Sequence, residues 1–225
     1  MDINDPNFHL KLQPTVGGAY EHSFDTMKKS FIELLLIIIV SALLFLPLGI
    51  VEATMESSGD VSWQAGLFNF FYGILIGIPL EFGVAWAFLK AVRGEKVEIR
   101  DLFAPFNNWL NVMGAGILSG VIIGFGILLL IIPGIIFACK LAFVPYLVMD
   151  KDMEPVAAIK KSWEMTNGYA ITIFLMYLLA IPVAILGFIL LIVGIIPASM
   201  WIEGAFASIY EAVLRRQGPE IIGTA

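Results

Sequence analysis

Three ionisable side chains lie inside long apolar runs and are the first candidates for chemistry: Glu81, Lys140 and Glu203. A charged side chain at mid-bilayer costs about 2.5 to 3.5 kcal/mol on insertion scales, so each needs an oppositely charged partner or a water-filled cavity. Counted from Ile135 and Pro197, where we expect two spans to begin, Lys140 and Glu203 lie at nearly equal depths. We therefore predict that Lys140 and Glu203 form a pair, and that Glu81 faces the same interior.

This predicted intramembrane polar site has two interpretations. A buried ion pair can fix which helix packs against which. The same groups can instead form a site for binding or transport. The sequence favours the structural role and leaves the second open.

The search for catalytic and metal-binding residues gives a negative result. His9 and His22 fall in an N-terminal segment without the cluster of ligands that a metal needs, so we expect both to be solvated. Ser119 lies in a glycine-rich run without a histidine to activate it, and we expect its hydroxyl to bond its own backbone. We predict no catalytic residue, no metal site, no cofactor and no enzyme activity.

The composition of the chain places it in a membrane. Its 225 residues are 59% apolar and 14% charged, whereas a soluble domain is nearer half apolar and a quarter charged. No long polar stretch divides the apolar runs, so we expect one membrane domain at 23–216. We expect a flexible cytoplasmic tail at 1–22, without a cleavable signal peptide, and a C-terminal tail at 217–225.

The apolar runs predict an all-α polytopic bundle of about six transmembrane helices arranged as three hairpins. Two runs have about the 20 residues that cross a hydrocarbon core of roughly 30 Å, and two are roughly twice as long. Each long run must fold back on itself, and we expect the breaks near Pro133 and at Gly194 to Pro197. The four runs are 31–51, 65–89, 109–149 and 169–214.

The two long runs resemble one another. Aligning Pro133 with Pro197 places Tyr146 on Tyr210, each 13 residues beyond its proline. This indicates a repeated hairpin, and chance similarity between two apolar sequences is an equally good explanation.

Basic residues fall on one side of the predicted membrane. Of the 13 Lys and Arg residues, all except Lys140 lie in the N-terminal segment, the second and fourth loops, or the C-terminus. Lys and Arg near span ends stay in the cytoplasm, so we predict a multi-pass protein of the cell (inner) membrane with both ends cytoplasmic.

Residues 152–168 predict an amphipathic helix lying along the cytoplasmic membrane surface. A proline opens it and Asn-Gly closes it. We expect Trp163 to anchor it, with Lys160 and Lys161 near anionic headgroups. The basic loops lack the aromatic interleaving of nucleic-acid binders, so membrane lipids and no nucleic acid are the expected partners.

Glycines at 116, 120 and 124 form small-residue steps that let helix backbones approach closely. We expect packing within the chain, with a homo-oligomer as the alternative.

Residues 95–216 resemble a broad group of bacterial membrane proteins. The shared features are Leu102-Phe-Ala-Pro-Phe106, a Leu-rich run ending in Pro133-Gly134, Pro145-Tyr146 with Asp150, and Ala158-Ile-Lys-Lys-Ser-Trp163. The group includes the membrane domain that accompanies some glycerophosphodiester phosphodiesterases, together with uncharacterised six-span families. The resemblance implies the membrane fold and a bacterial origin. It implies no catalysis, because the phosphodiesterase chemistry of those relatives belongs to a separate soluble domain.

These observations favour a non-enzymatic membrane protein that binds or senses a lipid-like or small amphipathic molecule. The alternatives are a transport or export subunit, and a scaffold that recruits a cytoplasmic protein partner through residues 90–108 and 150–168. A lateral groove would favour the first, and a wet cavity reaching Glu81 and Lys140 would favour transport.

Overall fold

The computed structural model describes residues 12–58, 63–190 and 192–217, and within these ranges the chain is helical without a strand. Two short elements depart from α-helix: η1 is a π-helical segment and η2 is a 3₁₀ helix. The elements are α2 (Val16–Lys29), α3 (Phe31–Ser58), α4 (Trp63–Tyr72), η1 (Gly73–Gly77), α5 (Ile78–Val92), η2 (Ile99–Asn108), α6 (Trp109–Leu129), α7 (Ile131–Leu141), α8 (Val144–Lys151), α9 (Pro155–Met165), α10 (Ala170–Ile189) and α11 (Ile192–Gln217).

The protein is an all-α, multi-pass membrane protein. In the described part of the chain, five helical stretches are long and apolar enough to cross a bilayer. The sixth predicted span corresponds to α11, whose second half carries Glu211, Arg215 and Arg216. The five stretches are Phe31–Thr54, Trp63–Val92, Ile99–Leu129, Ile131–Lys151 and Ala170–Ile189.

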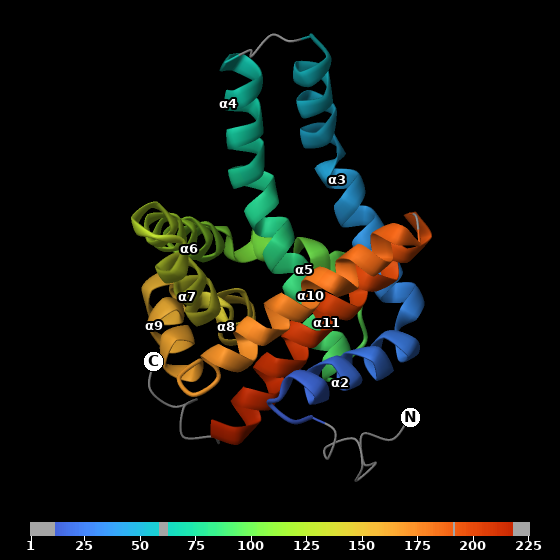
Figure 1. The fold of residues 1–225 in the computed structure, drawn as a ribbon, viewed down its shortest axis with the longest axis vertical. Coiled ribbons are helices and arrows are strands. Elements are labelled where there is room, and N and C mark those ends of the chain that lie inside the picture. Colours follow the sequence, from blue (N-terminus) through green and yellow to red (C-terminus); the bar gives the residue numbers. More distant parts are fainter. Residues whose placement is uncertain (1–11, 59–62, 191, 218–225) are drawn as a thin grey trace.

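Three helical hairpins diverge from a common base (Figure 1). They are α3–α4, α6–α7 and α10–α11, and their tips point in different directions in the view. The best-buried side chains lie at the base, where α5, α8 and α11 meet; Phe88, Leu147 and Tyr210 are examples with at most 1% exposure. The hydrophobic core therefore belongs to the base, and much of the hairpin surface is left for lipid.

The two later hairpins reverse before their prolines. We predicted the breaks near Pro133 and at Gly194 to Pro197, but α6 ends at Leu129 and α10 ends at Ile189. Pro133 lies in the first turn of α7, where its missing N–H has no intrahelical acceptor to lose, and Pro197 lies inside α11. The predicted breaks were therefore a few residues too late.

Paired glycines hold each of these hairpins together. A Cβ atom on Gly126 would lie 2.9 Å from Cα of Gly134, and one on Gly187 would lie 2.9 Å from the backbone oxygen of Gly194. Only glycine lets the two backbones come so close. The shared arrangement supports the interpretation of a repeated hairpin.

The predicted flexible tail at 1–22 is wrong for residues 16–22, which belong to α2; residues 1–11 lie outside the described part. Tyr20 and His22 on α2 are buried. Tyr20 donates a hydrogen bond to the carbonyl of Met176 (3.1 Å), and Trp201 donates one to the carbonyl of Tyr20 (2.8 Å). Burial raises the pKa of Tyr20 to about 12. The side chains that α2 buries are small or polar, so hydropathy gives no sign of them.

The helix predicted within residues 152–168 is present as α9. Its buried face carries Ala158, Ser162 and Met165. Val156 and Trp163 lie on the opposite, exposed face. A helix with this distribution suits the membrane interface.

Candidate functional site

Lys140 lies away from the acidic residues with which it was expected to pair. Its Nζ donates a hydrogen bond to Oδ1 of Asn167 (2.6 Å) and lies 5.7 Å from the ring centroid of Trp163. Lys140 is in the last turn of α7, and its long side chain turns towards α9 at the base. Equal depth in two helices does not fix the direction in which their side chains point. The predicted pair with Glu203 was therefore wrong.

The structure does bring Glu203 and Glu81 together. They come from α11 and α5, which pack against one another, and their carboxyl groups interact electrostatically. Within residues 12–58, 63–190 and 192–217, neither forms a hydrogen bond or an ion pair. Glu203 is half-buried and Glu81 is exposed at the surface of the chain. Two carboxyl groups therefore lie near one another in an apolar setting, where holding both as negative charges is unfavourable unless something else compensates them.

Two tyrosines complete this group, which we call the polar cluster: Glu81, Tyr146, Tyr177 and Glu203. The Tyr146 side chain interacts electrostatically with Glu203, Tyr177 and Glu81. Tyr146 is only 3% exposed, and its hydroxyl forms no hydrogen bond with any described residue. Tyr177 is 41% exposed, and its ring packs on Phe206 with centroids 4.6 Å apart.

A second charged group lies nearer the base, and we call it the arginine network: Arg93, Asp150, Tyr210, Glu211 and Arg215. Arg93 donates to both carboxylate oxygens of Asp150 and, at 2.8 Å, to Glu211. Burial opposes the charge on Arg93, but the Asp150 and Glu211 carboxylates outweigh it and raise the pKa of Arg93 above its usual range. Arg215 also donates to Glu211 (2.7 Å), and Tyr210 donates to Asp150 (3.1 Å). This network ties α5, α8 and α11 together.

A stacked pair of tyrosines connects the two groups. The rings of Tyr146 and Tyr210 lie 4.9 Å apart and 18° from parallel. Along α11, Glu203 precedes Glu211 by eight residues, or about 12 Å of helix. The polar cluster thus lies about two turns deeper towards the hairpin tips, and Tyr146 and Tyr210 are the residues that the sequence repeat had aligned.

Comparison with known proteins gives no independent assignment of this site. A scan against protein-family models and searches of curated proteins and solved structures found no match. The chemistry of the polar cluster is therefore inferred from its own residues and their surroundings.

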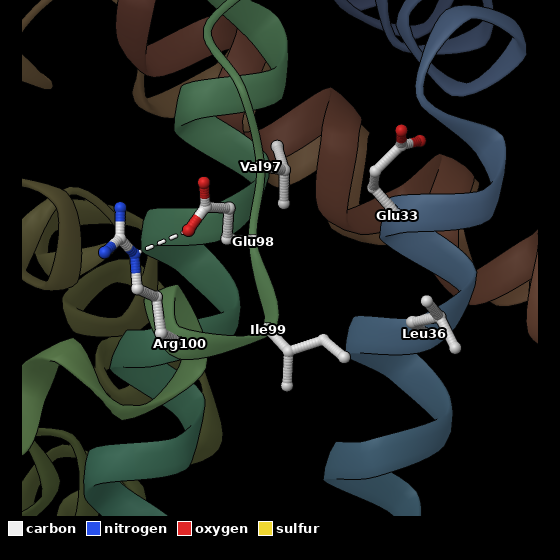
Figure 2. Close-up of a pocket in the computed structure, with 6 residues that line it drawn as sticks. All are labelled: Glu33, Leu36, Val97, Glu98, Ile99 and Arg100. Carbon is white, nitrogen blue, oxygen red and sulfur yellow. Dashed lines mark ion pairs between the residues drawn. The ribbon is translucent and has the colours of Figure 1, made fainter.

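A shallow recess of about 340 Å³ lies at the edge of the base (Figure 2). Glu33 and Leu36 of α3 form one wall, and the segment from Val97 to Arg100 forms the other. Arg100 and Glu98, both on the second wall, form an ion pair at 2.6 Å on the side that faces away from α3, and Arg100 is 81% exposed (Figure 2). The charges of Glu98 and Arg100 are thus compensated in water, and the recess is a weaker candidate site than the polar cluster.

The expected solvation of His22 is wrong, while His9 lies outside the described part. His22 is 3% exposed, and its Nδ1 is 3.1 Å from Oγ of Ser208. Ser208 donates to the carbonyl of Gly204, so it accepts from Nδ1–H of a neutral His22. Burial, followed by the charges of Lys29 and Arg215, lowers the pKa of His22 to about 4.

The structure also tests two smaller expectations, both about residues of α6. The hydroxyl of Ser119 is buried without a hydrogen bond in the described part of the chain, so the expected bond to its own backbone is wrong. Among the glycine steps, Gly116 packs on Ile78, whereas Gly120 and Gly124 face open space.

The basic residues of the surface helix remain at the base. Lys160 is exposed, and Nζ of Lys161 is 3.6 Å from Glu164. Trp163 lies 5.8 Å from the ring of Phe137 on α7. Through Trp163, α9 therefore reaches both Phe137 and Lys140 of α7.

Proposed function

We propose that this protein is a non-enzymatic membrane protein that binds a small amphipathic molecule through the polar cluster. The observation that carries the proposal is that Glu81, Glu203, Tyr146 and Tyr177 make no hydrogen bond or ion pair with the described part of the chain. Polar groups in an apolar setting need a partner. A molecule with a polar headgroup and an apolar tail supplies that partner, and its tail can lie along the lipid-facing helices.

The surroundings of the cluster favour entry from the side. The exposed ring of Tyr177 lies on α10, which also exposes Leu178 and Ile181. A ligand that reaches Glu81 and Tyr177 from the lipid passes only apolar surface of this helix. Membrane lipids or other membrane-dissolved amphiphiles are therefore the partners that the proposal requires.

Transport is less well supported as an alternative. A conducting path through the predicted polar site would have to include Lys140 as well as Glu81. Lys140 instead contacts Asn167 and Trp163 at the base. Between the polar cluster and the base, the stacked rings of Tyr146 and Tyr210 fill space with less than 4% exposure.

The proposal includes a location in the cell membrane with both ends in the cytoplasm. Its support is the distribution of Lys and Arg, twelve of which lie in segments on one predicted side. In a Cys139→Ala background, single cysteines at Ser58 and Gln217 can be labelled from outside intact cells. We expect labelling of the first and none of the second, and the reverse pattern would contradict the orientation.

Mass spectrometry of the gently purified protein tests the binding proposal. We expect an amphiphile retained at about one per chain and lost from the Glu81→Gln/Glu203→Gln double variant. Glu33→Gln is the matched control, because Glu33 is an exposed glutamate on α3 outside the cluster. An amphiphile content equal to that of bulk lipid in all three proteins would contradict the proposal.

A further inference from the structure

Buried hydroxyl groups of α9 fix the end of α7. Oγ of Ser162 donates a hydrogen bond to the carbonyl oxygen of Lys140 (2.7 Å) and accepts one from the backbone N–H of Phe143 (3.2 Å). Oγ1 of Thr166 lies 3.3 Å from the same carbonyl oxygen, and Ser162 and Thr166 are both 0% exposed. Because these contacts hold the backbone of Lys140, its side chain leaves α7 at a defined place beside the C-terminal end of α9.

Three side chains gather there, and we call them the donor group: Lys140, Trp163 and Asn167. Nζ of Lys140 donates to Oδ1 of Asn167 (2.6 Å), so the amide oxygen is engaged and the amide N–H groups are left. The other ammonium N–H groups and the indole N–H of Trp163 also have no acceptor among the described residues. What the donor group still offers is hydrogen-bond donors, which favours an anion as its partner.

The charge of Lys140 is not compensated within the described part of the chain. Glu164, the neighbour of Trp163 on α9, lies 3.6 Å from Nζ of Lys161 instead. The Trp163 ring, 5.7 Å from Nζ of Lys140, covers one side of the ammonium group. The next helix, α10, begins at Ala170 without a side-chain cap, and its N-terminus adds partial positive charge nearby.

Exposed apolar side chains on α7 and α10 indicate that the anion carries a hydrocarbon tail. Ile136, about one turn before Lys140 on α7, is 48% exposed, and Ile171 in the first turn of α10 is 76% exposed. Such surfaces face lipid in a multi-pass protein. Trp163 is 38% exposed, and tryptophan is enriched at the level of the headgroups. The donor group therefore lies where headgroups and hydrocarbon meet.

We infer that the donor group binds the headgroup of an anionic phospholipid. The phosphate oxygens accept hydrogen bonds from Lys140, Asn167 and Trp163, and the acyl chains lie along the exposed apolar surface of α7 and α10. This site is separate from the polar cluster and goes beyond the proposed function. It also differs from the sequence-based expectation, which assigned anionic headgroups to Lys160 and Lys161.

Two phospholipids with the same short acyl chains test this inference: dioctanoylphosphatidylglycerol, which is anionic, and dioctanoylphosphatidylcholine, which is zwitterionic. Native mass spectrometry counts the lipids bound to the full chain in a neutral detergent. We expect one saturable site for phosphatidylglycerol, at least about tenfold tighter than for phosphatidylcholine. Equal affinities would overturn the inference. Displacement of phosphatidylglycerol by millimolar inorganic phosphate would also overturn it, because the site would then take a soluble anion.

Substitution of two lysines locates the binding. Lys140→Gln removes a charged donor and should weaken binding of phosphatidylglycerol about tenfold or more. Lys160→Gln is the matched control, because Lys160 is an exposed lysine on α9 outside the donor group. Its replacement should leave the affinity within about threefold. Equal losses in the two variants would indicate a diffuse attraction to the basic surface and would overturn the inference.

Asn167→Asp tests the site without removing a side chain. The new carboxylate lies beside Nζ of Lys140, compensates its charge within the chain and repels the headgroup. The affinity for phosphatidylglycerol should fall about tenfold or more. The free energy of unfolding should not fall, because an ion pair replaces a neutral hydrogen bond. If Lys140→Gln does not fold, Asn167→Asp decides, and an unchanged affinity would overturn the inference.

The inference and the proposed function can fail separately. The polar-cluster variant Glu81→Gln/Glu203→Gln should leave binding of phosphatidylglycerol within about twofold, since Lys140 lies apart from the cluster. A loss in this variant as large as in Lys140→Gln would overturn the inference, because the lipid would then occupy the polar cluster.

Discussion

The arginine network and the polar cluster lie on the same helices and differ in how their charges are compensated. In the network, Asp150 contacts Arg93 and Lys151, and Glu211 contacts Arg93 and Arg215. In the cluster, Glu81 and Glu203 have only each other and two tyrosines. The carboxylates of the arginine network pair with basic side chains of the same chain, so a role in stabilising the fold accounts for them. The carboxyl groups of the polar cluster have no such partners, and for this reason we assign the cluster to a ligand.

The largest predicted effect is a loss of stability when Arg93, the residue that joins the arginine network, is replaced. Arg93→Ala leaves Asp150 and Glu211, which are 5% and 7% exposed, without their shared partner. Removing one partner from a buried ion pair costs about 3–5 kcal/mol, and we expect the lower end because Arg93 is 17% exposed.

Arg100→Ala is the control for this prediction. Arg100 is 81% exposed, and surface pairs contribute at most about 1 kcal/mol. The measurement is the free energy of unfolding in detergent. Equal losses in the two variants would show that the network does not hold the base together.

The next effect is a pH dependence caused by His22, whose pKa is lowered from 6.5 to about 4 in the folded protein. Between these two values the unfolded chain binds a proton that the folded chain does not, so stability falls as the pH falls from 6.5 to 4. The loss reaches about 3 kcal/mol and stops growing below pH 4.

His22→Asn removes this titration. The difference in free energy of unfolding between the wild type and this variant should therefore change between pH 6.5 and pH 4. Above pH 7.5 it should be constant. A constant difference across the whole range would contradict the assignment of a buried neutral histidine.

A smaller effect tests the close packing of the base. A Cβ atom on Gly83 would lie 2.1 Å from the backbone oxygen of Leu102, so Gly83→Ala forces α5 and η2 apart. We expect a loss of about 1–3 kcal/mol. Gly120→Ala is the matched control, because nothing lies within 4 Å of its added Cβ and alanine favours helix. A Gly83→Ala variant with the same free energy of unfolding as the wild type would show that α5 and η2 are not in such close contact.

The sequence predicts the helices of this fold better than the contacts between them. Hydropathy is sufficient for α3, α6 and α10, and proline and Asn-Gly bound α9, because these signals are local. Hydropathy does not predict the helix α2, because its buried face includes the polar residues His22 and Ser23. The partners of Arg93 are 57 and 118 residues away, and only packing of α5, α8 and α11 brings them together.

The candidate site could be predicted only in part. Glu81 and Glu203 stand out as acids within apolar runs, and this signal is sufficient to select them. Lys140 stands out in the same way, but its position in the last turn of α7 lets it reach Asn167. Tyr146 and Tyr177 lack any such signal, because tyrosine is common in membrane proteins near the membrane–water interfaces. The alignment of Tyr146 with Tyr210 was the one clue to the stacked pair.

The smallest predicted change is also the most direct test of the contrast between the two groups: the free energy of unfolding of Glu81→Gln/Glu203→Gln without added ligand. If the cluster serves a ligand, removing two uncompensated carboxylates leaves the stability unchanged or raises it. A loss as large as that of Arg93→Ala would contradict this account, because it would mean that Glu81 and Glu203 hold the fold together.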